Sequence, residues 1–149
     1  MHSRTRYPVR LVCPHAHPLA TVRRLTLKRI ARHPLVLGSE ESTSRIQVER
    51  AFAKAGLLDR LHVAISASSV PVLLTYLGTG QGIALIAPGP LPMPAPKRGH
   101  RHLVQRDATH LFGHEHLMIL QRRSRHELPH VRAFRELVQS HFATANGGG

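Results

Sequence analysis

Apolar residues follow two alternating patterns along this chain: short continuous runs and helical stripes. The continuous runs, typical of strands buried on both faces, cover residues 9–13, 34–37, 61–66 and 82–87. Between them, residues at positions i, i+3, i+4 and i+7 form one apolar stripe over 48–55 and another over 70–77. Strands without polar alternation, separated by amphipathic helices, predict an α/β protein whose mostly parallel sheet is covered by helices on both faces.

Capping residues set the expected ends of the helices. Thr26 is placed to cap a short helix over 25–31, and Ser68 or Ser69 to cap the helix that carries the second stripe. Gly56 follows the first striped helix, where a residue of left-handed conformation is favoured. These signals predict helices that begin and end within the stretches between the apolar runs.

The second half of the chain opens with a proline-rich stretch. Residues 87–98 carry proline at every second position from 88 to 96, which excludes a helix or a central strand. An extended loop is expected there, and a ligand for a proline-binding module is the alternative. Beyond it, the apolar pattern predicts strands over 101–106 and 116–123, a final amphipathic helix over 128–142 and a frayed tail over 143–149.

The strong positive charge raises a different possibility. The formal net charge is +13, and clustered cations favour nucleic acid because they release phosphate counterions. However, 18 of the 21 basic residues are arginine, they are scattered, and aromatic residues make up 4% of the chain. No zinc-finger spacing or helix-turn-helix pair is visible. A free-standing basic nucleic-acid-binding protein therefore stays open as an alternative, without a motif in its support.

The sequence also bears on the compartment. No apolar run approaches the ~20 residues that a membrane-spanning helix needs, which excludes a membrane partner. The basic N-terminal stretch has an apolar run broken by Pro8 and Pro14, unlike a signal peptide. Cys13 is the single cysteine and has no internal disulfide partner, which suits a reducing cytoplasm. A cytoplasmic protein is expected.

Two clusters of hydroxyl side chains stand where helices begin. The first consists of Ser39, Ser42, Thr43 and Ser44, and the second of Ser66, Ser68 and Ser69. Both follow predicted strands, and parallel sheets bind ligands beyond the carboxyl ends of their strands. Free backbone N–H groups at helix starts suit a carboxylate or sulfate, so the clusters predict a cradle for a small anion. The alternative is that one residue caps each helix and the others face water, which the acids Glu40 and Glu41 favour because they would repel an anion.

Other chemistry has weaker support in the sequence. The histidines of the HxxxHxH pattern over 110–116 lack the converging spacing of a zinc site, so no metal is expected. No G-x-S-x-G elbow, P-loop or dinucleotide-binding glycine pattern occurs, and no cofactor is expected. Cys13, with His15 and His17 nearby, flanks a turn broken by proline and lacks an orienting acid. An enzyme is therefore not predicted.

The order of these signals resembles one family. The segments HPLA (17–20), PLVL (34–37), AFAKAGL (51–57) and TYLGTGQGIALI (75–86) look like the effector-binding domain of LysR-type transcriptional regulators, over about residues 11–142. Within that family, TSR (43–45), TY (75–76), DATHLF (107–112) and RRS (122–124) are most similar to the regulators of cysteine and sulfur assimilation. The resemblance implies a periplasmic-binding-protein-like (type 2) fold of two Rossmann-like lobes, with a small metabolite in the cleft between them.

The resemblance also implies a domain organisation. Residues 1–13 would end lobe I and cross over, 14–100 would form lobe II, and 101–142 would return to a partial lobe I. The winged helix-turn-helix of the family has no counterpart, so the chain is expected to be a truncated regulator that reaches DNA only indirectly. Its expected partners are a small anionic effector (sulfate, O-acetylserine or a carboxylate) and a second copy or an intact regulator subunit. Thr43 would then contact the effector, and the alternative is a non-functional fragment.

Overall fold

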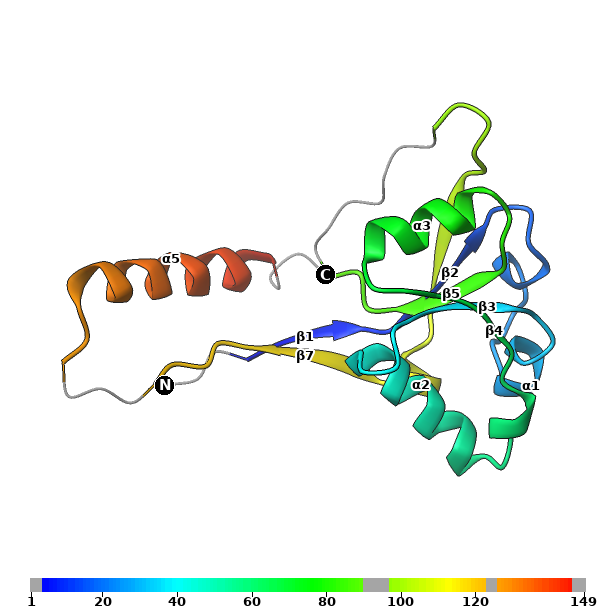
Figure 1. The fold of residues 1–149 in the computed structure, drawn as a ribbon, viewed down its shortest axis with the longest axis horizontal. Coiled ribbons are helices and arrows are strands. Elements are labelled where there is room, and N and C mark those ends of the chain that lie inside the picture. The colour runs from blue at the N-terminus through cyan, green and yellow to red at the C-terminus, as the bar shows by residue number, and fades with distance from the viewer. Residues whose placement is uncertain (1–3, 90–96, 123–125, 146–149) are drawn as a thin grey trace. The chain divides into compact units, whose positions relative to one another are not determined.

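The structure of this chain is a computed structural model that describes residues 4–89, 97–122 and 126–145 (Figure 1). The chain divides into two compact units. The larger unit spans residues 8–115, and the smaller unit combines residues 1–7 with residues 116–149. No helix among the described residues is long and apolar enough to cross a membrane.

A five-stranded sheet forms the centre of the larger unit. Its strands, in spatial order, are β4 (Val63–Ala67), β3 (Leu35–Gly38), β5 (Ile83–Ile86), β2 (Arg10–Pro14) and β6 (Leu103–Asp107). β3 pairs in parallel with β4 and β5, whereas β2 is antiparallel to β5 and β6. Four strands therefore run in one direction and β2 runs in the other, which confirms a mostly parallel sheet.

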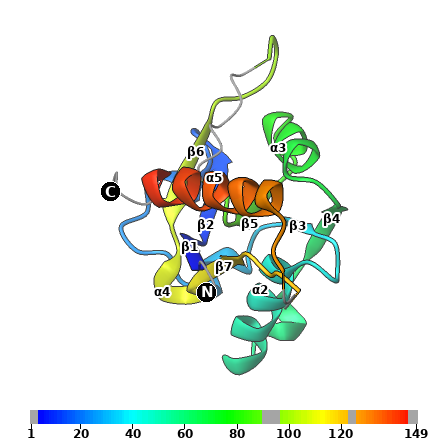
Figure 2. The same cartoon turned by 90° about the vertical axis from the view of Figure 1, so that its left-hand side faces the viewer.

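Helices cover both faces of this sheet (Figures 1 and 2). The helices on one face are α1 (Leu27–Ile30), α2 (Thr43–Lys54) and α4 (Thr109–Phe112), and the opposite face carries α3 (Val70–Gly78). Side chains alternate between the two cores, because Leu35 and Leu37 of β3 pack with the first group of helices while Val36 packs with α3. Two-sided burial explains why β2, β3 and β5 read as continuous apolar runs. The run at 61–66 was wrongly expected to be a strand buried on both faces, because β4 lies at the edge of the sheet and alternates between half-buried and exposed residues up to Ala67.

The expected stripes and caps are largely confirmed. Val48 and Phe52 of α2 are fully buried, but Ala55 is exposed because the helix ends at Lys54. In α3 the buried side chains are those of Leu73, Leu74 and Leu77. The Thr26 hydroxyl accepts a hydrogen bond from the Arg29 backbone N–H at 3.2 Å, as expected for an N-cap.

Glycine is required where the chain enters β5. Gly82 has φ +91°, and an added Cβ would collide with the backbone carbonyl oxygen of Pro34. Gly56, after α2, also has a positive φ of 70°, but nothing lies within 4 Å of its would-be Cβ. The two positions therefore differ in the space available and share the need for a left-handed backbone.

Alanine substitutions at these two positions are expected to differ in cost. Gly56→Ala should lower the free energy of unfolding by about 1 kcal/mol, the cost of a left-handed alanine. Gly82→Ala should lower it by about 2 kcal/mol or more, because the steric collision adds to the same backbone strain. Urea unfolding followed by circular dichroism measures both values, and equal losses would contradict the role assigned to Pro34.

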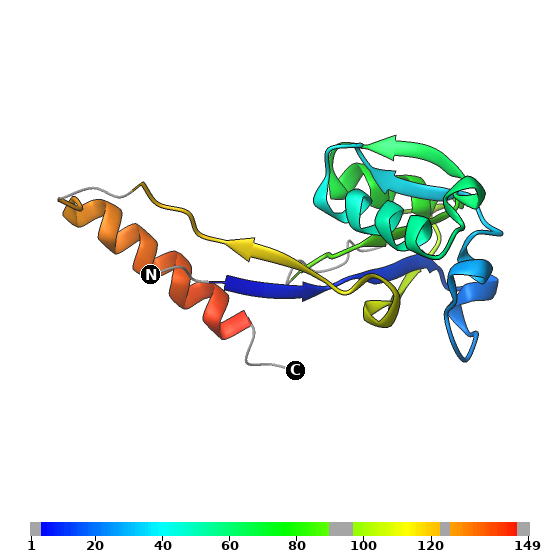
Figure 3. The ribbon, with the colours of Figure 1, turned by 90° about the horizontal axis from the view of Figure 1, so that it is seen from below.

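The remaining short elements are two single-turn 3-10 helices and a strand pair. The helices are η1 (Pro18–Ala20) and η2 (Leu58–Arg60). β1 (Arg4–Pro8) and β7 (His114–Met118) lie side by side as a two-stranded sheet (Figure 3). β7 begins and ends earlier than the strand expected over 116–123, and the final helix, α5 (Pro129–Ala145), begins one residue later than expected and extends further. Residues 90–96 of the proline-rich stretch lie outside the described residues.

Part of the apolar stripe of α5 is exposed, whereas Val138 and Phe142 are half-buried. Phe134 and Leu137 are 68% and 67% exposed, and Val131 is also exposed. On the polar side, the carboxylate of Glu127 accepts hydrogen bonds from the guanidinium groups of Arg135 at 3.0 Å and Arg132 at 3.3 Å. These contacts lower the pKa of Glu127 to about 2, with the Arg135 hydrogen bond as the main cause. The helix therefore leaves an apolar face without cover among the described residues.

The central sheet includes strands from segments that the family resemblance assigns to the crossing and to the return to lobe I. These strands are β2 and β6, and both are paired in the sheet. Each contributes to cores that also include the helices of the larger unit, through Leu11 and Val104, for example. The larger unit therefore extends beyond 14–100 at both ends, to residues 8 and 115.

Candidate functional site at the carboxyl edge of the sheet

The two hydroxyl clusters lie at the same edge of the sheet. β3 and β4 are parallel neighbours, and their last residues, Gly38 and Ala67, are register partners. α2 begins shortly after Gly38, and α3 begins shortly after Ala67. The starts of both helices therefore follow the carboxyl ends of adjacent strands, as the sequence predicts. Ser66 itself lies within β4, and Thr43 and Ser44 lie in the first turn of α2.

The Arg45 side chain links elements at this edge of the sheet. Its side chain is 10% exposed, and its Nη1 donates hydrogen bonds to the Ser66 Oγ at 2.8 Å and to the Gly38 carbonyl oxygen at 3.3 Å. Its Nε donates to the Glu49 carboxylate at 2.9 Å. One planar guanidinium thus connects α2 with the ends of both strands, a geometry that its fixed fork of donors allows.

The structure assigns different tasks to the predicted hydroxyl residues. The hydroxyl of Ser42 accepts the Arg45 backbone N–H and that of Ser69 accepts the Val72 N–H, each at 3.4 Å, so these two serines are N-caps. Ser66 serves as the acceptor for Arg45. The capping interpretation is therefore confirmed for one residue in each cluster.

The remaining predicted residues have no such structural task. The Ser39 carbonyl oxygen accepts the Ser42 N–H at 2.9 Å, which closes the turn into α2. Thr43 and Ser68 are exposed, and Ser44 is half-buried. Among the described residues, no hydrogen bond from the hydroxyls of Ser39, Thr43, Ser44 or Ser68 is found.

Gly38 makes the tight turn into α2 possible. A Cβ at this position would collide with the Ser42 hydroxyl, and the Ser44 hydroxyl would lie 3.7 Å from it. The absence of a side chain lets the capping serine pack directly against the end of β3. The backbone N–H groups at the start of α2 are thereby held at the edge of the sheet.

Charge at this edge is mixed. Arg45 contributes a permanent cation, and Glu49 neutralises part of it through the contact at Nε. The Nη2 group makes no hydrogen bond among the described residues, and the Glu40 carboxylate, which is 84% exposed, lies 4.0 Å from it. An exposed carboxylate at that distance contributes little, so Nη2 keeps donor capacity for an anion.

The structure shows the surroundings of Cys13 and of two histidines. Cys13 is fully buried in the core, and burial raises the pKa of its thiol to about 11, partly offset by the charge of Arg106. A protonated, inaccessible thiol is a poor nucleophile. His17 and His33 pack edge to face at 4.5 Å, and burial lowers the pKa of each. Within the described ranges, no group of three or more His, Cys, Asp or Glu residues is arranged to hold a metal ion.

Comparison with known proteins identifies the family of this fold. The family described as "LysR substrate binding domain" matches residues 3–143. The chain belongs to this family. The resemblance found in the sequence is therefore confirmed, together with the α/β, periplasmic-binding-protein-like fold class.

Individual LysR relatives are regulators of transcription. The chain is 32% identical over 130 residues to the HTH-type transcriptional regulator cbl of Escherichia coli (strain K12), which covers 87% of this chain and 39% of that protein. It is 32% identical over 96 residues to the HTH-type transcriptional regulator CysB of Haemophilus influenzae, which covers 64% of this chain and 28% of that protein. A solved structure of the cofactor-binding domain of the Cbl transcriptional regulator superposes with a TM-score of 0.71 at 30% identity, over 91% of this chain and 58% of that one. The chain thus spans well under two thirds of these relatives.

Proposed function

We propose that this chain works as part of the effector-binding domain of a LysR-type regulator, and that the carboxyl edge of its sheet contacts a small anionic effector. The observation that carries the proposal is the buried Arg45 guanidinium, which stands between the two helix starts with Nη2 not engaged in a hydrogen bond among the described residues. Thr43 and Ser68 add exposed hydroxyls at the same edge. Together they provide donors for an anion, as helix starts do in other anion sites.

Sulfate, O-acetylserine and simple carboxylates are the effector classes that we propose. All three present oxygen atoms that accept hydrogen bonds from backbone N–H, hydroxyl and guanidinium groups. The relatives named Cbl and CysB support the resemblance of TSR (43–45) to the cysteine and sulfur-assimilation regulators. An anion of this size needs a few well-placed donors, which this edge supplies.

The proposed role within a regulator follows from the two units. We propose that residues 8–115 act as lobe II and that the smaller unit contributes to lobe I. The exposed apolar side chains of Phe134 and Leu137 support further polypeptide packing on that unit, from an intact regulator subunit or a second copy. An effector that binds better to one arrangement of the lobes shifts their populations, and a cytoplasmic regulator would transmit the shift to DNA through its helix-turn-helix.

Calorimetric titration tests the effector proposal. Sulfate, thiosulfate, O-acetylserine and acetate are titrated into the chain and into Thr43→Ala. Loss of one hydrogen bond to an anion should weaken binding of the active compound about tenfold, which corresponds to ~1.4 kcal/mol. Thr21→Ala is the matched control, because Thr21 is also exposed but follows β2, whose carboxyl end lies at the other edge of the sheet.

The outcomes separate the alternatives. Binding heat with one of these anions, reduced in Thr43→Ala and unchanged in Thr21→Ala, supports the proposal. No heat with any of them, or equal affinity in both variants, would remove this edge from consideration as an effector site. If the chain instead retards duplex DNA in a gel, in a salt-sensitive and sequence-independent way that no anion changes, the nucleic-acid alternative is favoured.

A further inference from the structure

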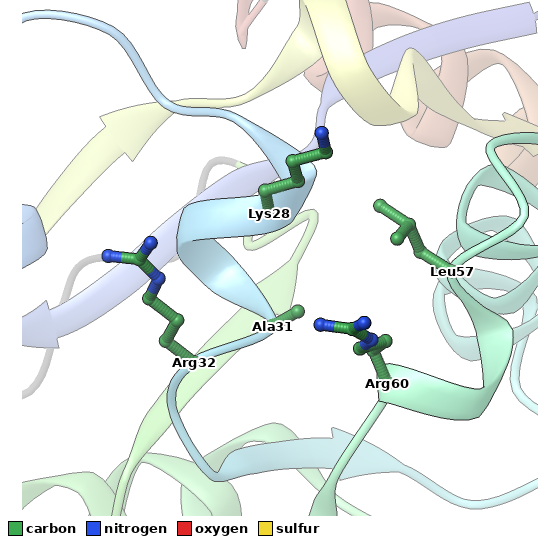
Figure 4. Close-up of a pocket in the computed structure, with 5 residues that line it drawn as sticks. All are labelled: Lys28, Ala31, Arg32, Leu57 and Arg60. Carbon is green, nitrogen blue, oxygen red and sulfur yellow. The ribbon is translucent and has the colours of Figure 1, made fainter.

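A pocket lies in the larger unit, away from the Arg45 edge. It has a volume of about 440 Å³, and its lining consists of Lys28, Ala31, Arg32, Leu57 and Arg60 (Figure 4). The first three residues come from α1 and the turn after it, and the other two from the segment between α2 and β4. Pockets of roughly 300–1,000 Å³ are the size that small-molecule ligands occupy.

The pocket is placed at the amino end of the parallel strands. α1 leads into β3, and η2 leads into β4. The starts of these two strands are held together, because the Leu35 backbone N–H donates to the His62 carbonyl oxygen at 2.8 Å and Leu35 is in register with Val63. The Arg45 site lies where the same two strands end. The two sites therefore lie at opposite edges of the sheet and share no residue.

The lining of this pocket carries three cations. Lys28 and Arg32 project from the α1 side, and Arg60 projects from η2, with its guanidinium reaching toward Ala31 (Figure 4). In the described part of the chain, the salt bridges involve other arginines, and none joins these three residues to an acid, Asp59 of η2 included. All three cations line the pocket, but only the Arg60 guanidinium reaches toward Ala31, and that of Arg32 points away from Arg60 (Figure 4).

Helix capping does not explain this arrangement. Basic residues near a helix C-terminus complement its dipole, and Lys28 stands in the last turn of α1. However, α1 has four residues, so its dipole is small, and Arg60 belongs to a separate element on the other wall. Like charges around one pocket repel one another in the absence of an anion. An anionic ligand would remove that repulsion.

We propose that this pocket binds a small molecule with at least two anionic groups, of the phosphorylated or polycarboxylate class. Arg60 supplies a planar fork suited to phosphate or carboxylate oxygens and Lys28 a point charge, and Arg32, which also lines the pocket, adds a third exposed cation. Leu57 and Ala31 provide an apolar floor for a short carbon skeleton. The site is independent of the effector edge, so its ligand and the effector can be bound together.

Titration with inorganic pyrophosphate and with citrate tests this proposal. Both should bind the full chain at low ionic strength, and Lys28→Gln and Arg60→Gln should each weaken binding about tenfold, since a charged hydrogen bond contributes about 1.5–3 kcal/mol. All three cationic side chains are exposed, so the variants should keep the fold, which circular dichroism verifies. Arg23→Gln is the matched control: it removes the same charge from an exposed residue outside the lining.

Each other outcome would overturn the proposal. If Arg23→Gln weakens binding as much as Arg60→Gln, the attraction belongs to the net charge of the chain and not to the pocket. If neither anion binds at millimolar concentration while duplex DNA does, the cations serve nucleic-acid contact. If Thr43→Ala weakens pyrophosphate binding as much as Arg60→Gln, the anion occupies the Arg45 edge. The last result would leave the proposed effector function intact.

Discussion

Phe52→Ala is expected to lower the free energy of unfolding by about 3–5 kcal/mol, the range for a phenylalanine removed from a packed core. Phe52 is fully buried on the inner face of α2. Its ring stacks on that of Phe112 in α4, with 6.3 Å between centroids and 19° between planes. The substitution leaves a cavity between α2, α4 and the sheet. Domains of this size have about 5–15 kcal/mol in total, so the variant should be close to unfolding at 37 °C.

Urea unfolding of the variant beside Ile46→Ala checks this expectation. Ile46 is on the same helix but 43% exposed, so its truncation should cost about 0.5 kcal/mol or slightly more. Both substitutions remove a large apolar side chain from α2 and keep the helix propensity high. Similar losses in the two variants would show that α2 does not pack through Phe52.

Arg45→Met is expected to have the second-largest effect, on stability and on effector binding together. The change removes the donor that joins Ser66, Gly38 and Glu49, and a hydrogen bond to a charged group contributes about 1.5–3 kcal/mol. Glu49 is 38% exposed and water compensates part of its lost partner, so the total loss in free energy of unfolding should be about 2–3 kcal/mol. Effector binding should fall below detection, because the cation at the carboxyl edge is gone.

Two further variants separate charge from geometry. Arg50→Met removes an exposed arginine of the same helix, and it should change neither stability beyond about 0.5 kcal/mol nor effector affinity. Arg45→Lys keeps the charge but not the planar fork, so it should retain weak binding and lose most of the stability contribution. If Arg45→Lys matches the unsubstituted chain in urea unfolding, the hydrogen bonds at this edge do not stabilise the fold.

Local patterns in the sequence predict much of this fold. β3 and β5 are buried on both faces, so every residue in them is apolar or small. Their positions can therefore be predicted from the sequence alone. The caps Thr26 and Ser42 are likewise local, because the acceptor and donor are three residues apart. The family resemblance adds the topology class, which the local patterns do not contain.

Features that depend on contacts between residues far apart in the chain could not be predicted from the sequence. β2 is apolar like its neighbours, and nothing in its composition shows that it is antiparallel or that β6 pairs beside it. Arg45 belongs to the TSR segment, but its hydrogen bond to Ser66 joins residues 21 positions apart. The basic pocket combines exposed residues from two elements, and exposed cations have no periodicity that links them.

The position of β2 also governs when the larger unit can fold. This strand is the first of the central sheet in the chain, yet it lies between β5 and β6, with Arg10 in register with Ile86 on one side and Asp107 on the other. During synthesis, β2 must therefore wait without its partners until nearly the whole unit has left the ribosome. Closing such long loops is entropically costly and slows folding. Until then the apolar side chains around Leu11 stay exposed on the nascent chain. This segment is consequently the one most prone to aggregate before folding is complete.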